Sequence, residues 1–84
     1  MTVQEFYTDE SKWCKDTLSD GKGATCLLGA LSSCHQTKGA YTQALGQLVA
    51  AIQAYVGYTS VARFNDAETT TFADIVKVVR MAGV

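Results

Sequence analysis

Proline is absent from the 84 residues, charged residues are sparse, and histidine occurs once. Without proline, turns must come from glycine, asparagine, aspartate and serine. The formal net charge of −1 offers no electrostatic attraction to nucleic acid or to anionic lipid. The lysines are scattered and are not interleaved with aromatic residues. We therefore expect no nucleic-acid partner and no membrane partner.

The start of the chain has no basic residue followed by an apolar stretch, so we expect no secretory signal and a cytoplasmic location. Three cysteines, an odd number, then predict free thiols in a reducing compartment. Residues 39–62 contain no charge, which formally invites a membrane-spanning interpretation. Glutamine, threonine and glycine interrupt this stretch, so we expect no membrane span.

The first part of the chain predicts short helices. Thr2 with Glu5 three positions later is a capping-box pattern, and a second helix signal begins at Thr8. We expect one bent helix or two short helices that reach Leu18. The residues that this part should bury are Trp13, Cys14 and Leu18. The glycine-containing residues 19–23 then predict a connecting loop.

Apolar periodicity predicts two helices in the middle of the chain. The first follows the loop and ends at Gly39, and Gly29 inside it should allow another helix to approach closely. The second covers residues 41–56, where apolar residues form one stripe. The stripe consists of Tyr41, Leu45, Leu48, Val49, Ile52, Tyr55 and Val56. The opposite face has no charge, so this helix is either packed on both sides or part of an interface.

Capping patterns also mark the last part of the chain. Ser60 precedes a single predicted turn over residues 61–64, and Thr71 with Asp74 repeats the capping-box spacing before the last helix. The predicted fold class is all-α. We expect a compact bundle of four to five short helices, in a single domain over residues 1–84, with the uncharged helix at its centre.

Four landmarks follow one another along the chain. They are Trp13, the run CLLGAL at residues 26–31, the tripeptide FND at residues 64–66, and the Thr-capped last helix. In this order they resemble a family of small domains of unknown function from actinobacteria and their bacteriophages, whose pattern reads Trp, C-A-L-G-A-L, W-N-D and a Thr-initiated helix. The resemblance covers about residues 3–82 and departs from the pattern at Leu27 and Phe64. It implies an actinobacterial or phage source and brings no activity with it.

Two sets of residues are candidates for binding. The first is a candidate interface on the uncharged face of the helix over residues 41–56. It consists of Gln43, Gly46, Gln47, Ala50, Gln53 and Ala54. The second is a candidate pocket at the landmark positions. It consists of Trp13, Cys26, Asn65 and Asp66. For Asn65 and Asp66 we favour a simpler interpretation, an Asx turn between two helices in which their side chains accept backbone N–H groups.

Catalytic and metal-binding patterns are weak. Adjacent helical residues diverge by about 100°, so Cys34 and His35 should not form a nucleophile–base pair. Cys14 and Cys26 with that pair would supply four zinc ligands, but no Cys-x-x-Cys spacing is present and buried thiols are favoured. The loop at residues 20–23 lacks the preceding strand of a phosphate-binding loop. We therefore predict no catalytic residue, no metal and no cofactor.

Two functions from different classes follow. The favoured one is a small, non-enzymatic, cytoplasmic interaction protein that binds another protein or itself through helix surfaces, as a homo-oligomer or with a host protein if phage-encoded. The alternative is a small-molecule-binding domain or enzyme that uses the candidate pocket.

Overall fold

The computed structural model describes all 84 residues and contains helices but no β-strand. In chain order the elements are α1 (Val3–Phe6), the 3-10 helix η1 (Glu10–Lys12), α2 (Leu27–Cys34), α3 (Lys38–Val56), α4 (Val61–Asp66) and α5 (Phe72–Ala82). The predicted all-α fold of short helices is therefore confirmed, with α3 as the one long helix.

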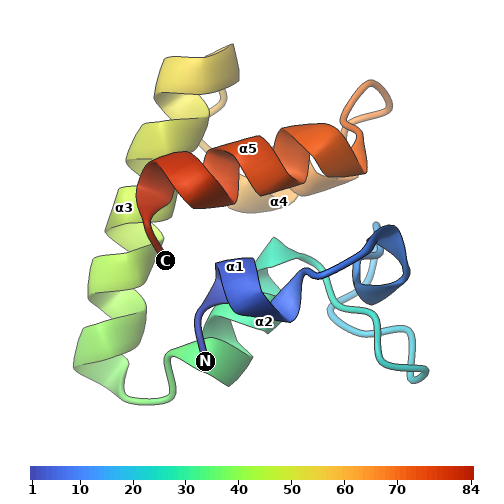
Figure 1. Cartoon of the computed structure of the whole chain (residues 1–84). Helices are drawn as coiled ribbons and strands as arrows, with labels where there is room; N and C mark the ends of the chain where they lie inside the picture. Colours follow the sequence, from blue (N-terminus) through green and yellow to red (C-terminus); the bar gives the residue numbers. More distant parts are fainter.

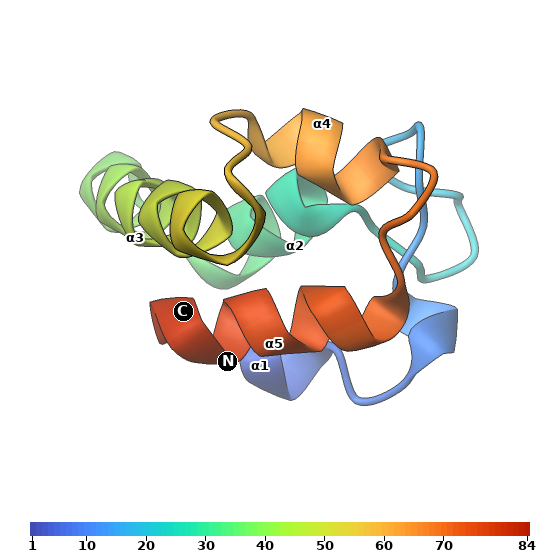
Figure 2. The same ribbon diagram turned by 90° about the horizontal axis from the view of Figure 1, so that it is seen from above.

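The helices surround one core in two layers. α1 and α5 lie in one layer, and α2 and α4 lie in the other (Figure 2). α3 runs across one end and contacts α2, α4 and α5, whereas the irregular residues 13–26 lie at the opposite end (Figure 1). The two ends of the chain meet, because the backbone N–H of Val3 donates to the carbonyl oxygen of Val84 at 2.9 Å.

Side chains from all five α-helices meet in this core. The largest fully buried side chains are Phe64, Leu27, Leu31, Leu48, Ile52, Ile75, Val3, Val78, Val79 and Asn65. Each buried apolar side chain of this size stabilises the fold by about 1.5–3 kcal/mol. Asn65 is the one polar residue in that set, so it must satisfy its hydrogen bonds inside the protein.

The predicted helix starts at Thr2, Ser60 and Thr71 are confirmed. Thr2 and Thr71 each form a complete capping box, with Glu5 and Asp74 as the acidic partners. The Ser60 side chain accepts the backbone N–H of Arg63 at the start of α4. Each such cap stabilises a helix by about 1 kcal/mol.

The prediction of a helix that reaches Leu18 is wrong. After α1 only the three residues of η1 are helical, and residues 13–26 then follow an irregular path. The cause is a partner distant in sequence, since Thr25 accepts the N–H of Cys14 and donates its own N–H to the Lys12 carbonyl. Leu18 is 64% exposed rather than buried, and Trp13 and Cys14 are half-buried.

The boundary between the two middle helices also differs from the prediction. α2 starts at Leu27 and ends at Cys34, and Gly39 lies inside α3 instead of ending α2. Thr37 explains the difference, because its side chain accepts the N–H of Ala40 and caps α3. α3 therefore starts three residues earlier than the apolar stripe indicated.

Gly29 does allow a close approach, but not by a helix. A Cβ atom at this position would lie 2.6 Å from the backbone oxygen of Leu18 and 3.1 Å from Cβ of Thr25. The approaching backbone belongs to the irregular residues 13–26, and its Leu18 carbonyl accepts the N–H of Cys26.

The buried face of α3 is rotated from the predicted stripe. Ala44 and Ala51 are buried with Leu48 and Ile52, whereas Val56 is 47% exposed. Alanine permits the close approach of a neighbouring helix, which a count of large apolar residues does not detect. None of the helices combines the length and the apolar character that crossing a membrane requires.

Candidate functional site

Asn65 lies at the C-terminal end of α4 and is 1% exposed. Its Oδ1 accepts hydrogen bonds from Nε1 of Trp13 at 2.7 Å and from the backbone N–H of Leu27 at 3.0 Å. Its Nδ2 donates to the Cys14 carbonyl at 3.1 Å and to Oδ1 of Asp66 at 2.8 Å. The amide therefore uses both donors and both acceptor sites. We call this set of contacts the Asn65 network.

The contact with Leu27 takes the place of a local helix cap. Cys26 is the N-cap residue of α2 and makes no side-chain capping bond. The Asn65 amide, which arrives from another helix, satisfies the first backbone N–H of α2 instead. The start of α2 thus depends on a residue 38 positions further along the chain.

Asp66 extends the network to the exposed turn at Asp16. Oδ1 of Asp66 accepts the Asp16 N–H at 2.8 Å, and Asp16 adopts a positive φ of 67°. Lys15 adds a second tie, since Nζ donates to the Ala67 carbonyl at 2.7 Å and lies 5.5 Å from the centre of the Trp13 ring. Residues 13–16 are thereby attached to the end of α4.

The predicted Asx turn is therefore wrong. Asn65 and Asp66 do accept backbone N–H groups, but these belong to Leu27 and Asp16. Both residues also lie within α4 rather than in a turn between helices. A local interpretation failed because the partners are 38 and 50 positions away.

A cavity of about 190 Å³ lies beside the Asn65 network. Its lining residues are Asp16, Thr17, Leu18, Cys26, Leu28, Ala62, Asn65 and Asp66. Three of the four candidate pocket residues, Cys26, Asn65 and Asp66, thus line one cavity. The volume is below the range of about 300–1,000 Å³ that is usual for small-molecule sites.

Trp13, the fourth candidate pocket residue, does not line this cavity. Its ring packs toward Phe72, with the ring centres 6.2 Å apart, and only its Nε1 reaches Asn65. Tyr7 also holds this region, because its hydroxyl donates to the Thr25 carbonyl at 2.9 Å. Burial raises the pKa of Tyr7 well above its ordinary value, so this phenol stays a donor.

The six candidate interface residues of α3 are all exposed. We call this surface, formed by Gln43, Gly46, Gln47, Ala50, Gln53 and Ala54, the outer face of α3. No other helix of the chain covers it, so the interpretation that α3 is packed on both sides does not hold within one molecule. Val56 and Tyr58, at the end of α3 and just after it, are also exposed, at 47% and 39%.

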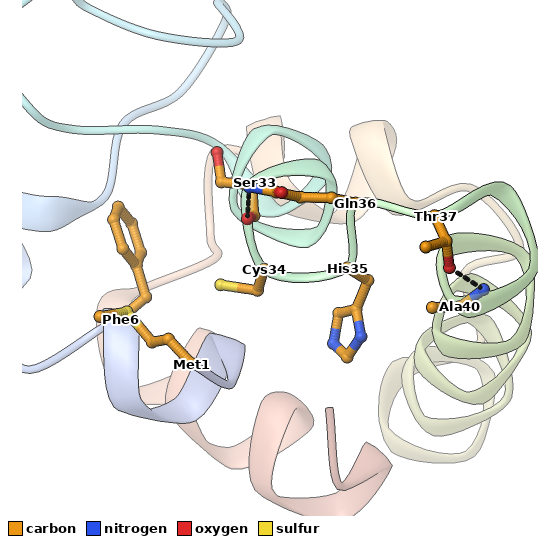
Figure 3. Close-up of a pocket in the computed structure, with 8 residues that line it drawn as sticks. All are labelled: Met1, Phe6, Ser33, Cys34, His35, Gln36, Thr37 and Ala40. Atoms are coloured by element: carbon orange, nitrogen blue, oxygen red, sulfur yellow. Dashed lines mark hydrogen bonds between the residues drawn. The ribbon is translucent and has the colours of Figure 1, made fainter.

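Cys34 and His35 line a different cavity of about 520 Å³ between α1 and the start of α3. Their side chains point in different directions, the thiol toward Phe6 and the imidazole toward the C-terminal end of the chain (Figure 3). The imidazole Nε2 lies 3.0 Å from the carbonyl oxygen of Val84, and burial raises the pKa of the Cys34 thiol. The predicted divergence of this pair is confirmed.

The sequence also offers the loop at residues 20–23 and the three cysteines as possible sites. The Asp20 carboxylate accepts the backbone N–H groups of Lys22 and Ala24, which lowers its pKa and closes the loop upon itself. All three cysteines are free thiols, and no three of the histidine, cysteine, aspartate and glutamate side chains are grouped as metal ligands would be.

Residues 7–83 match the model of a family of unknown function, DUF6197. The chain belongs to this family. Its model spans the Trp13, CLLGAL, FND and Thr-helix landmarks, so the resemblance to a family of unknown function is confirmed. No curated protein and no solved structure matches the chain. The Asn65 network brings three of the four landmarks together, namely Trp13, the CLLGAL run and the FND tripeptide.

Proposed function

We propose that this protein is a small, non-enzymatic interaction protein of the cytoplasm that binds a protein partner through the outer face of α3. The observation that carries the proposal is that all six residues of this face are exposed and none is charged. Exposed positions of a surface helix usually carry Lys or Glu, which keep the protein soluble and monomeric.

The composition of the outer face suits contact with another helix. Gly46, Ala50 and Ala54 follow one another at intervals of four residues, so they lie along one line of the helix. Their small side chains allow a second backbone to come close, and the neighbouring glutamines supply both donors and acceptors for hydrogen bonds across an interface. The 19 residues of α3 give a helix of roughly 28 Å, long enough for several turns of contact.

The partner is either a second copy of the chain or a host protein. A neutral face with glutamines is complementary to itself, which favours a homo-oligomer. The resemblance to domains of actinobacteria and their phages supports the second possibility, in which a phage protein binds a protein in the host cytoplasm.

Charge substitutions on the outer face test this proposal. We expect Ala50→Glu and Ala54→Glu each to abolish association, because a buried carboxylate without a partner is costly. Glu is a good helix former, so the helix content measured by circular dichroism should not change. Association is measured by sedimentation velocity over a range of concentrations, and by recovery of a defined partner from host lysate.

Ala73→Glu is the matched control. Ala73 is an exposed alanine in the first turn of α5, and the substitution makes the same chemical change outside the outer face of α3. It should leave association intact. Association that survives both α3 substitutions, or a wild-type chain that stays monomeric and retains no partner, would contradict the proposal.

A small-molecule site is the second candidate function. The specific observation in its favour is that Cys26, Asn65 and Asp66 line one cavity. Trp13 is the only tryptophan and is bonded to Asn65, so its fluorescence reports on the cavity wall. A saturable change in that fluorescence with a small molecule, lost in Asp66→Asn, would favour this function over protein binding.

A further inference from the structure

Backbone hydrogen bonds pair the two residues that directly precede Cys14 and Cys26. Trp13 and Thr25 form an isolated parallel bridge, in which Thr25 donates to the Lys12 carbonyl at 2.9 Å and Cys14 donates to the Thr25 carbonyl at 3.2 Å. The next residues in this register are Cys14 and Cys26. Neighbouring strands lie about 4.8 Å apart, and disulfides join Cα atoms that are about 4.4–6.8 Å apart.

The local backbone supports this register up to the cysteines. Trp13 has φ −116° and ψ 139°, and Cys26 has φ −75° and ψ 175°, so both are extended. The peptide groups that lead into Cys14 and leave Thr25 are therefore oriented as they would be in a short parallel ladder.

Both cysteines also lie beside the same irregular turn. Sγ of Cys14 lies 3.6 Å from the Thr17 carbonyl oxygen, and Cys26 lines the small cavity together with Thr17 and Leu18. Cys34, in contrast, lines the separate cavity with Phe6 and has no cysteine beside it. The three free thiols thus divide into one pair and one single residue.

We propose that Cys14 and Cys26 form a redox-active pair that closes to an internal disulfide by exchange with a low-molecular-weight disulfide. Cys14 is half-buried and Cys26 is 8% exposed, so Cys14 reacts first. Its thiolate attacks one sulfur of the small disulfide, which forms a mixed disulfide and releases one small thiol. The Cys26 thiolate then attacks the Cys14 sulfur and releases the second small thiol. Two protein thiols are oxidised, and the small disulfide is reduced to two thiols that keep the two protons.

The environment of Cys14 makes this pair slow to react. Burial and the carboxylates of Asp20 and Asp66 raise the pKa of Cys14, so little thiolate is present at neutral pH. The pair therefore suits a response to sustained oxidation rather than rapid turnover.

The disulfide would lock the segment that the Asn65 network already holds. Nδ2 of Asn65 donates to the Cys14 carbonyl, and Oδ1 accepts the N–H of Leu27, the residue after Cys26. A disulfide between Cys14 and Cys26 lowers the conformational entropy of the unfolded chain and so stabilises the fold. For a loop of this size, we expect the oxidised form to unfold at a Tm more than about 5 °C higher than the reduced form.

Oxidised glutathione and intact-mass measurement test the pair in the folded full chain. We expect the reduced protein to lose two hydrogen atoms without gaining glutathione on Cys14 or Cys26, and peptide mapping to show those two residues linked. Cys34 takes up glutathione or stays free. Cys34→Ser should leave the internal link unchanged, whereas Cys14→Ser and Cys26→Ser should each prevent it.

Three results would overturn the proposal. One is a stable glutathione adduct on Cys14 of the folded wild-type chain while Cys26 remains a free thiol. Another is a pair that stays reduced after prolonged exposure. The third is a link that forms only in denaturant. Because peptide mapping of the wild-type chain decides between these results, the test does not depend on whether the serine variants fold. The irregular residues 13–26, which include both cysteines, lie at the opposite end of the molecule from α3 (Figure 1), so this test is independent of the association tests.

Discussion

The indole Nε1 of Trp13 donates a hydrogen bond of 2.7 Å to Oδ1 of Asn65, across 52 positions of the chain. The same oxygen accepts the backbone N–H of Leu27 at the start of α2. Asn65 thus joins the irregular residues 13–26, α2 and α4. Three of the family landmarks meet at this one amide. These hydrogen bonds hold the irregular segment on the helices. This structural role is a sufficient physical reason for Trp13 and Asn65 to occur together.

Replacing Asn65 with alanine should destabilise the fold strongly. The substitution leaves the N–H groups of Trp13 and Leu27 without an acceptor in a buried place, and each such group costs about 1–3 kcal/mol. We expect Asn65→Ala to lower the free energy of unfolding by about 3 kcal/mol, measured by urea unfolding. Gln4→Ala, which removes an exposed amide from α1, should change it by less than about 0.5 kcal/mol. Equal effects of the two substitutions would show that the Asn65 network contributes little.

Replacing Asn65 with aspartate tests the donor side of the same amide. Nδ2 faces the Cys14 carbonyl and the Asp66 carboxylate, so an oxygen at this position meets two acceptors and a negative charge. Burial and Asp66 would raise the pKa of the new carboxyl group in the folded state. We therefore expect a loss of about 3 kcal/mol or more at pH 7, which becomes smaller as the pH falls and the group is protonated. Urea unfolding at pH 7 and pH 4 measures this, and a loss that is the same at both values would contradict the expectation.

A double-mutant cycle isolates the bond between Trp13 and Asn65. Trp13→Phe removes the Nε1 donor and keeps an aromatic ring against Phe72. If the bond contributes as the geometry indicates, the double variant with Asn65→Ala should be more stable than the sum of the single losses predicts, by about 1 kcal/mol. Additive losses would mean that the two residues act separately.

Local rules predicted the helix starts at Thr2, Ser60 and Thr71, because each cap involves residues within three positions of one another. They failed for residues 13–26, where the shape depends on Thr25 and Asn65. Three of the four candidate pocket residues line one cavity, and Trp13 reaches only Asn65. The family resemblance alone grouped them, since no spacing rule joins positions 13, 26 and 65. The small cavity beside them also depends on the irregular residues 16–18, which no helical pattern predicts.

Two glycines inside helices should respond oppositely to alanine. At Gly29 a Cβ atom would lie 2.6 Å from the Leu18 carbonyl oxygen, whereas at Gly46 no such contact lies within 4 Å. Alanine favours a helix over glycine by about 1 kcal/mol. We therefore expect Gly46→Ala to raise the free energy of unfolding by about 0.5–1 kcal/mol, and Gly29→Ala to lower it by about 1–3 kcal/mol. Thermal unfolding of both variants checks this, and a stabilising Gly29→Ala would show that the Leu18 carbonyl moves away at little cost.

The Asp74 carboxylate should account for part of the loss of stability in acid. Its pKa is lowered first by the hydrogen bond from the Thr71 backbone and then by the one from the Tyr55 hydroxyl, which lies 2.8 Å away. A group whose pKa is lower in the folded state stabilises the fold above its unfolded pKa, which is near 3.8. The stability that Asp74 contributes is lost as the pH falls through its lowered pKa in the folded state.

Asp74→Asn tests this pH dependence. The amide cannot replace both acceptor oxygens of the carboxylate, so we expect a loss of about 1 kcal/mol at pH 7. The difference from the wild type should shrink as the pH falls from about 4 toward 2, because the wild-type carboxylate is then protonated as well. Glu68→Gln, at an exposed residue before α5, is the matched control and should follow the wild-type curve. If the Asp74→Asn difference stays constant down to pH 2, the carboxylate charge does not stabilise the start of α5, and the capping geometry alone accounts for the loss.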